Sequence, residues 1–163
     1  MQLSVVKGDI TRQRVDAIVN AANRRMRGGG GVDGAIHAAG GPAILAECIA
    51  RFPDGLPTGQ AGYTTGGDLP ASYVIHVVGP NYRAGERDRA LLVSCYANAL
   101  RIGDELGIDS IAFPLVSAGI YGWPREDAVR AAVDTLRATP TSVGAAFIVA
   151  FDDAMHREVS AAL

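Results

Sequence analysis

The residues best suited to chemistry lie around a run of four glycines, Gly28 to Gly31. The run joins an apolar stretch that ends before Asn20 to a helical pattern that starts near Val32. Glycine has no Cβ, so the backbone amides of such a loop approach a phosphate closely, and the helix N-terminus adds partial positive charge. The spacing matches neither a P-loop nor a dinucleotide fingerprint. We therefore expect a phosphate-bearing ligand here, in preference to a flexible linker.

Asn23 and Asp33 stand at the two ends of this glycine loop. A carboxamide holds sugar hydroxyls in a fixed orientation, and a carboxylate orients or deprotonates a water molecule. The simpler alternatives are a turn residue for Asn23 and a helix N-cap for Asp33. An N-cap position would lower the pKa of Asp33. We therefore expect Asp33 to position a water and to take up a proton late.

Two further segments are candidates for the same site. The segment Ser117 to Gly122 follows an apolar stretch and precedes a helical pattern, and its Tyr121 is expected to be exposed, where the ring packs on a sugar. An ordinary strand-to-helix connection with a core tyrosine remains open. Asp9, after the first apolar stretch, has a carboxylate that accepts hydrogen bonds from an exocyclic amine such as that of adenine. Taken alone, its sequence favours a turn or an N-cap.

The remaining reactive side chains indicate no further chemistry. His37 and His76 stand in apolar patterns and are expected in the core, while His156 is expected to face solvent. No pair has metal-ligand spacing, so we predict no metal site. Ser117 and Cys95 could act as nucleophiles only with an adjacent base, and the Gly-x-Ser-x-Gly elbow is absent. Nucleophilic catalysis is therefore not predicted.

Strand-like and helical stretches alternate along the chain and predict an α/β fold with three layers. The expected strands are Leu3–Val6, Ala17–Val19, Tyr63–Thr65, Tyr73–Val78, Ile111–Leu115 and Ala145–Phe151. The expected helices are Val32–Ala39, Pro42–Arg51, Asp88–Leu106, Pro124–Arg137 and a last one that Asp152 or Asp153 caps. Ligands in such folds bind beyond the carboxyl ends of the strands, where the candidate loops would meet.

Composition narrows the class of protein. The chain has 163 residues, 48% of them hydrophobic and 20% charged, which predicts one folded domain over residues 1–163 and excludes wholesale disorder. A net charge of −2 makes RNA an improbable partner. Two cysteines are too few for a disulfide scaffold, and no apolar run approaches the roughly 20 residues that span a bilayer. Without a recognisable signal peptide, we expect a cytoplasmic monomer that does not enter membranes.

At this point the sequence resembles the macrodomains, specifically the MacroD-type ADP-ribose hydrolases. The most specific motif is the glycine block that continues as Val32-Asp33-Gly34-Ala35-Ile36-His37. The other matching stretches, in the same order, are Gly8–Thr11, Val15–Asn23, Val74–His76, Val78–Pro80, Ile111–Pro114 and Ser117–Pro124. The resemblance implies a six-stranded mixed sheet between helices, a cleft for ADP-ribose and no cofactor.

The resemblance also assigns roles. Asp9 would accept from the adenine amine, with Ile10 beside it, and Phe151 would lie against adenine. Gly30–Asp33 and Ser117–Tyr121 would hold the diphosphate. Asn23 would orient the distal ribose, and Asp33 would act on the hydrolytic water, which makes these two residues the candidate catalytic pair. The expected ligand contacts are Asp9, Ile10, Ala22, Asn23, Gly30, Gly31, Val32, Asp33, Ser117, Ala118, Gly119, Ile120, Tyr121 and Phe151.

The activity implied is metal-independent hydrolysis of ADP-ribose esters, either O-acetyl-ADP-ribose or mono-ADP-ribosylated acidic side chains of proteins. The Asn23–Asp33 pair favours an enzyme, and the alternative is a non-enzymatic ADP-ribose binding module. Leu56 and Gln60 replace a cysteine and a glutamate common in the family, and we expect an effect on local packing only. The stretch Arg24–Arg27 is more basic than usual and is expected to bias substrate choice, although a solvated loop is the ordinary interpretation.

Overall fold

A computed structural model describes all residues, 1–163, and contains one six-stranded sheet. The strands are β1 (Gln2–Lys7), β2 (Ala17–Ala22), β3 (Ala61–Thr65), β4 (Tyr73–Val78), β5 (Ser110–Phe113) and β6 (Ala145–Ala150). Their spatial order is β1-β6-β5-β2-β4-β3. All neighbours pair in parallel except β3, which runs antiparallel to β4 at one edge. The predicted mixed sheet of six strands is therefore confirmed.

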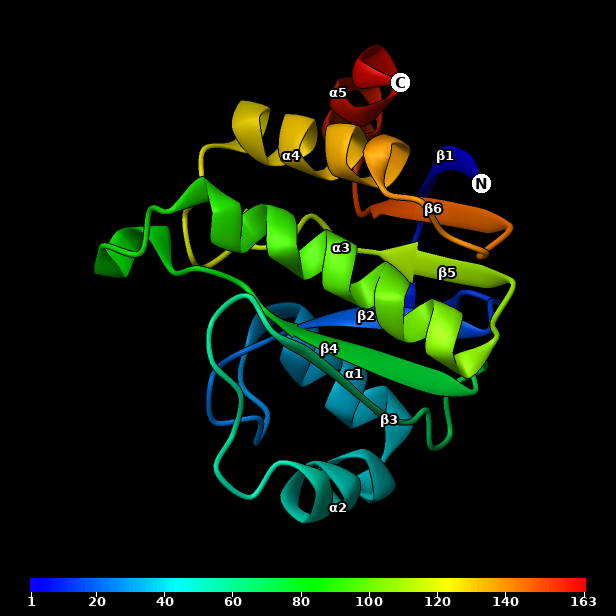
Figure 1. Cartoon of the computed structure of the whole chain (residues 1–163), viewed down its shortest axis with the longest axis vertical. Helices are drawn as coiled ribbons and strands as arrows, with labels where there is room; N and C mark the ends of the chain where they lie inside the picture. The colour runs from blue at the N-terminus through cyan, green and yellow to red at the C-terminus, as the bar shows by residue number, and fades with distance from the viewer.

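Helices cover both faces of the sheet, which confirms the predicted three-layer α/β/α architecture (Figure 1). One face carries α1 (Gly31–Gly40) and α2 (Pro42–Arg51). The other carries α3 (Arg89–Leu106), α4 (Arg125–Ala138) and α5 (Asp153–Ala162). Two short 3₁₀ helices, η1 (Ile10–Arg12) and η2 (Tyr82–Ala84), lie in the connections.

The strands supply two separate cores because alternate side chains point to opposite faces. In β2, Val19 packs with the core under α3 to α5, whereas Ile18 packs with the core under α1 and α2. In β4, Ile75 and Val74 divide in the same way. This explains the nearly continuous apolar runs in the sequence, since both faces of these central strands are buried.

Local signals in the sequence set most helix ends. Pro42 is the first residue of α2, where its missing N–H has no cost. Asp88 caps α3 by accepting a hydrogen bond from the Ala90 amide, and Asp152 caps α5 in the same manner. Gly107 ends α3 in the left-handed conformation with φ of 67°.

Several element ends differ by one or two residues from the sequence prediction, and four further details were wrong. Strand β2 continues past Val19 to Ala22, so Asn20 lies inside it. Strand β5 ends at Phe113 instead of Leu115, because Pro114 has no N–H to donate to the ladder. Phe151 follows β6 in a bend instead of ending the strand, and His156 is half-buried instead of fully facing solvent.

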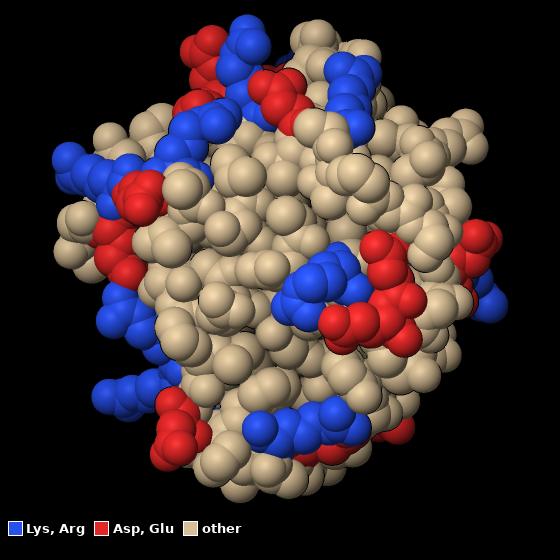
Figure 2. Space-filling view, in the orientation of Figure 1, with Lys and Arg blue, Asp and Glu red and all other residues tan.

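The parallel strands place five carboxyl ends along one edge of the sheet. The segments that begin there are Gly8-Asp9 after β1, Asn23 after β2, Gly79 after β4, Pro114–Tyr121 after β5 and Phe151 after β6. No helix is both long and apolar enough to cross a bilayer. On the face drawn in Figure 2, basic side chains lie among acidic ones and form no continuous basic surface.

Candidate active site

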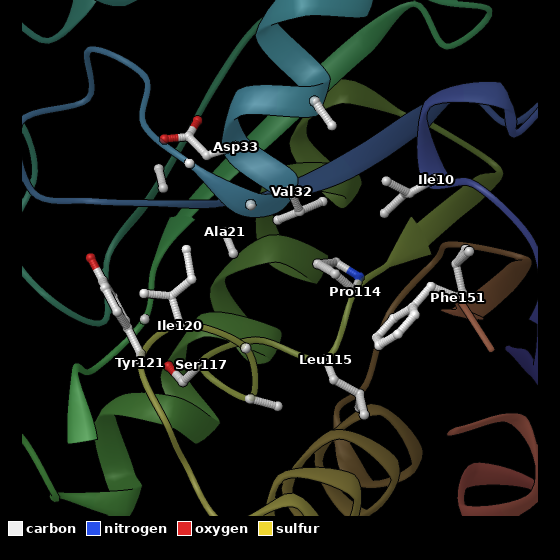
Figure 3. Close-up of a pocket in the computed structure, with 18 of the residues that line it drawn as sticks. Ile10, Ala21, Val32, Asp33, Pro114, Leu115, Ser117, Ile120, Tyr121 and Phe151 are labelled. Carbon is white, nitrogen blue, oxygen red and sulfur yellow. The ribbon is translucent and has the colours of Figure 1, made fainter. Parts of the chain in front are cut away.

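A cleft of about 800 Å³ opens at this edge of the sheet and is lined by the segments that follow the parallel strands. All fourteen residues expected to contact a ligand line it. Ile10 and Phe151 lie at one end, Asp33 and Tyr121 lie at the other, and Val32 and Ile120 face each other between them (Figure 3). Its volume is in the range of about 300–1,000 Å³ that small-molecule sites occupy.

The glycine loop brings an uncapped helix N-terminus to the cleft. Gly30 is the N-cap of α1, and no side chain satisfies the amides of the first turn. These amides point out of the helix and attract anions. The loop packs so closely on α1 that a Cβ at Gly34 would lie 2.6 Å from the Gly29 carbonyl oxygen. Glycine is therefore required there by close backbone approach.

The second loop reaches the same place from β5. Its base is held by the buried Tyr96, whose hydroxyl accepts a hydrogen bond from the Val116 amide at 3.0 Å. Ser117 is left-handed, with φ of 65°, and its buried hydroxyl has no partner within the chain. The amides of Gly119, Ile120 and Tyr121 donate to no other backbone carbonyl. The loop thus presents several free donors to the cleft.

The two loops meet across the cleft. The side chain of Ile120 is 64% exposed, yet its Cδ1 lies 3.4 Å from where a Cβ on Gly31 would stand and 3.6 Å from the same position on Gly30. Larger residues at either glycine would press on Ile120. The free amides of both loops therefore line a common narrow passage in the middle of the cleft.

Asn23 and Asp33 converge on Gly29. A Cβ there would lie 3.2 Å from Asn23 Nδ2 and 3.2 Å from Asp33 Oδ2, so the two polar groups flank the same backbone position. The carboxamide of Asn23 is oriented at both ends. Its Nδ2 donates to the Gly28 carbonyl at 3.2 Å, and its Oδ1 accepts from the Arg25 amide at 3.0 Å.

A buried network of hydrogen bonds positions the Asp33 carboxylate from the side of the sheet. Asn20 donates through Nδ2 to Asp33 Oδ1 at 2.8 Å and contacts His76 Nδ1 at 3.1 Å. On the other side of the ring, His76 Nε2 lies 2.9 Å from the Thr64 hydroxyl, which donates to the Thr65 carbonyl. The hydroxyl therefore accepts from Nε2–H, and the neutral imidazole accepts from Asn20. His37 Nε2 adds a contact of 3.4 Å to Asp33 Oδ1.

The environment of Asp33 corrects the sequence prediction of an N-cap. Asp33 is the third residue of α1 and is only 4% exposed, while Gly30 occupies the cap. Desolvation raises the pKa of Asp33 above its ordinary value, outweighing the Asn20 hydrogen bond and the nearby His37 that lower it. The predicted downward shift was wrong because burial, which the sequence does not reveal, dominates. A more basic carboxylate is better suited to accept a proton.

The other reactive side chains are structural. His76 is in the core as predicted, and burial, followed by the charge of His37, lowers its pKa to about 3. Desolvation raises the pKa of Cys48 to about 11 and that of Cys95 to about 12, so neither thiol ionises readily. No group of three or more His, Cys, Asp or Glu side chains is placed to hold a metal ion.

The opposite end of the cleft is more open. Asp9 caps η1 by accepting from the Thr11 amide and hydroxyl, as its sequence alone favoured, and these bonds lower its pKa. Both bonds go to Oδ1, while Oδ2 lies 3.9 Å from Arg12 Nε and accepts no hydrogen bond within the chain. Phe151 is 69% exposed beside Ile10, although both line the cleft. A flat apolar group is the natural occupant of this end.

The basic residues beside the glycine loop differ in role. Arg27 donates to the carbonyls of Cys48 and Pro53 and ties the loop to α2. Arg24 pairs with Glu86, and Arg25 forms no ion pair. Tyr121, expected to be exposed, is half-buried, and burial followed by the charges of Glu86 and Asp33 raises its pKa. Leu56 and Gln60 do not line the cleft.

Sequence reasoning missed several lining residues. They are Gly8, Ala21, Gly29, Ala35, Gly79, Pro114, Leu115, Arg125, Val149 and Met155. Arg125 is the most informative, because it starts α4 at the cleft and its Nε lies 2.9 Å from Glu158 Oε2. The predicted helix start at Pro124 was a usable signal, since first-turn residues of a helix that follows a strand lie near the strand's carboxyl end. Gly79 has no such signal, and a Cβ there would overlap the Ser117 hydroxyl.

Comparison with known proteins decides the family. A family model described as the Macro domain matches residues 19–132. The chain belongs to the macro domain family. A Macro domain-containing protein of Streptomyces nogalater is 56% identical over 154 residues, covering 92% of this macro domain chain and 85% of the relative. A Pantoea vagans protein named O-acetyl-ADP-ribose deacetylase 1 is 49% identical over 139 residues, covering 83% of this chain and 81% of the relative.

Solved macrodomains share the fold. The structure of a Trypanosoma brucei macrodomain in complex with ADP-ribose superimposes with a TM-score of 0.88 and 39% sequence identity, over 98% of this chain and 68% of that chain. The resemblance to macrodomains drawn from the sequence motifs is thereby confirmed, as is the fold that it implied.

Proposed function

We propose that this macro domain protein binds ADP-ribose and hydrolyses acyl esters of its distal ribose. The observation that carries the proposal is the convergence of Asn23 and Asp33 on Gly29, at the end of a cleft whose middle is lined by free amides. The T. brucei macrodomain in complex with ADP-ribose supports the choice of ligand. The name of the P. vagans relative, O-acetyl-ADP-ribose deacetylase 1, supports the choice of reaction.

The ligand fits the cleft in one orientation. Adenine lies between Ile10 and Phe151, with its amine donating to Asp9 Oδ2. The diphosphate occupies the narrow passage, where the amides of the α1 first turn and of Gly119 to Tyr121 donate to its oxygens. The distal ribose then reaches Asn23. The reverse orientation would place the diphosphate correctly but would leave a hydrophilic sugar against Phe151 and the adenine against buried carboxylate.

The reaction is the addition of water to an ester. Asp33 and a phosphate oxygen of the ligand hold a water near the acyl carbon, and the Asn23 carboxamide fixes the ribose. The water oxygen bonds to the acyl carbon while Asp33 accepts one proton of the water, the bond from that carbon to the ribose oxygen breaks, and the proton passes from Asp33 to the ribose oxygen. The products are ADP-ribose and a free carboxylic acid. Positioning is the main catalytic contribution, and well-held geometry accounts for about 7–11 kcal/mol of barrier reduction in favourable cases.

The test is direct. The chain is incubated with O-acetyl-ADP-ribose in the presence of a chelator, and free acetate is measured against a protein-free control. The proposal predicts acetate release that the chelator does not reduce. If ADP-ribose binds but no acetate appears, the protein is a binding module and the hydrolase assignment is rejected. If acetate release stops with chelation, the metal-independent mechanism is rejected.

A further inference from the structure

A second cleft of about 460 Å³ adjoins the Asn23 end of the first. The two clefts share Asn23, Gly79 and Tyr121, and no residue from the Phe151 end takes part. The rest of its lining consists of Arg24, Arg25, Thr58, Val78, Asn81, Ala84 and Glu86. It is therefore a continuation of the site on the side where the proposed function places the distal ribose.

One wall of this second cleft is locked by polar contacts. Arg24 pairs with Glu86 and donates through Nε to the Thr58 hydroxyl at 2.9 Å. Thr58 in turn donates to Glu86 Oε2 at 2.9 Å, and the Asn81 amide donates to Glu86 Oε1 at 3.0 Å. The charges of Arg24 and Glu86 compensate each other within the wall. Neither is free to pair with a ligand without breaking an existing contact.

Arg25 is the exception in this cleft. Its side chain is exposed and no carboxylate lies within ion-pair distance, so its charge is uncompensated. Its backbone is fixed because its amide donates to Asn23 Oδ1. The backbone of Arg25 is thus tied to the proposed ribose-binding carboxamide, and its side chain brings an unbalanced positive charge to the second cleft. A guanidinium is suited to bidentate pairing with a carboxylate.

The volume of the second cleft indicates that it can hold a group larger than acetyl. An acetyl group is far smaller than a space of about 460 Å³. Tyr121 lines both clefts and so lies where they join. An acyl group on the distal ribose would therefore pass from Asn23 past Tyr121 into the second cleft, and a longer chain attached to it would reach Arg25.

Resting on the proposed function, we propose that the second cleft binds the peptide segment that carries an ADP-ribosylated acidic residue, and that Arg25 pairs with a further Asp or Glu of that segment. Among the substrates that the family resemblance implies, this contact is available to mono-ADP-ribosylated acidic side chains of proteins and not to O-acetyl-ADP-ribose. Arg25 would give specificity for the amino-acid sequence beside the modified residue, whereas the first cleft binds only the ADP-ribose group.

The experiment measures binding, so it does not depend on turnover. Three probes are titrated calorimetrically into the full chain at low salt: free ADP-ribose, and two peptides that carry ADP-ribose through a hydrolysis-resistant linkage. The two peptides differ only in having Glu or Gln beside the modified position. The variants are Arg25→Gln, Arg25→Glu and the control Arg14→Glu. Arg14 is also exposed and without an ion pair, but it lines neither cleft.

We expect the unmodified protein to bind the acidic peptide about threefold to fivefold more tightly than the neutral one, the upper part of the range for an exposed ion pair. Arg25→Gln abolishes this preference, Arg25→Glu reverses it, and Arg14→Glu retains it. About 0.5 M salt also removes it, because exposed charges are screened.

Equal binding of the two peptides, or a preference that survives in both Arg25 variants, overturns this proposal alone, provided that free ADP-ribose binds. Failure of free ADP-ribose to bind the unmodified protein overturns the proposed function together with it. Affinity for free ADP-ribose in each variant also reports whether the first cleft has stayed intact.

Discussion

The two ends of the main cleft are built on different physical principles. At one end, Asp33 is buried and held by Asn20, which itself contacts His76 in the next strand. At the other end, Phe151 is 69% exposed and lies in a bend directly after β6. One end is rigid and polar, and the other is open and apolar.

This difference separates the two tasks that the proposed function requires. Chemistry needs a carboxylate in a fixed place with a raised pKa, and burial provides both at the Asp33 end. Affinity for a flat base needs exposed apolar surface that the ligand covers on binding, which Phe151 provides. Changes at the Asp33 end should therefore alter turnover, and changes at the Phe151 end should alter affinity.

The largest effect is expected for Asp33→Asn. The amide keeps the shape of the side chain but cannot accept a proton, so kcat for O-acetyl-ADP-ribose should fall at least about 100-fold, as for the loss of a general base. Calorimetry should find the Kd for ADP-ribose within about threefold of the original value. A variant with unchanged kcat would remove Asp33 from the mechanism, and a large loss of affinity would mean that the two ends are not separable.

Asn20→Ala should be the most destabilising change beneath the site. It removes the donor to Asp33 and the contact to His76, both of them buried, and should lower the free energy of unfolding by about 2–3 kcal/mol. The matched control is Lys7→Ala, because Lys7 and Asp153 form an exposed pair near the Phe151 end. Denaturant unfolding should detect no change in that control. Equal effects of the two substitutions would contradict the contrast between the ends.

Phe151→Ala should weaken ADP-ribose binding about tenfold, since stacking on a base contributes about 1–3 kcal/mol. Turnover at saturating substrate should change by less than about twofold, because Phe151 lies at the end away from Asp33 (Figure 3). Steady-state kinetics separate the two effects as KM and kcat. A fall in kcat without a change in KM would reverse the roles assigned to the two ends.

The smallest effect concerns pH. His76 is neutral in the folded protein with a pKa of about 3, while an unfolded histidine titrates near 6.5. Below pH 6.5 the unfolded chain therefore binds a proton that the folded chain does not, and stability falls as pH falls. Between pH 7 and pH 6 this histidine should lower the free energy of unfolding by about 0.7 kcal/mol. Denaturant unfolding at pH 7 and pH 6 should show that His76→Gln lacks this decrease of about 0.7 kcal/mol. If the free energy of unfolding of the variant and of the unmodified protein fell equally with pH, His76 would not be held neutral in the folded protein.

Sequence reasoning predicted the fold well because the fold depends on local signals. Apolar runs marked the strands, Pro42 marked the start of α2, and Gly107 marked the end of α3. The three loops that the sequence singled out, those after β1, β2 and β5, all line the cleft, because parallel strands place their following loops at one edge regardless of detailed packing.

Predictions from the sequence were wrong for residues whose environment depends on contacts with distant parts of the chain. Asn20 looked like the end of a strand because it is polar, yet it lies inside β2, where its partners Asp33 and His76 are 13 and 56 positions away. Burial of Asp33, which the sequence does not reveal, reverses the expected direction of its pKa shift, although the Asn20 hydrogen bond lowers that pKa. Arg125 was missed although a local signal existed, because the predicted helix start at Pro124 places the first turn of α4 near the carboxyl end of β5.

A crystal structure with bound ADP-ribose tests the central claim most directly. The account predicts the diphosphate between the α1 N-terminus and the Ser117–Tyr121 loop, with adenine against Phe151. The distal ribose should lie within about 2.6–3.2 Å of the Asn23 carboxamide, with a water between Asp33 and a phosphate oxygen. A distal ribose directed away from Asn23 and Asp33, or a diphosphate bound outside the two loops, would contradict it.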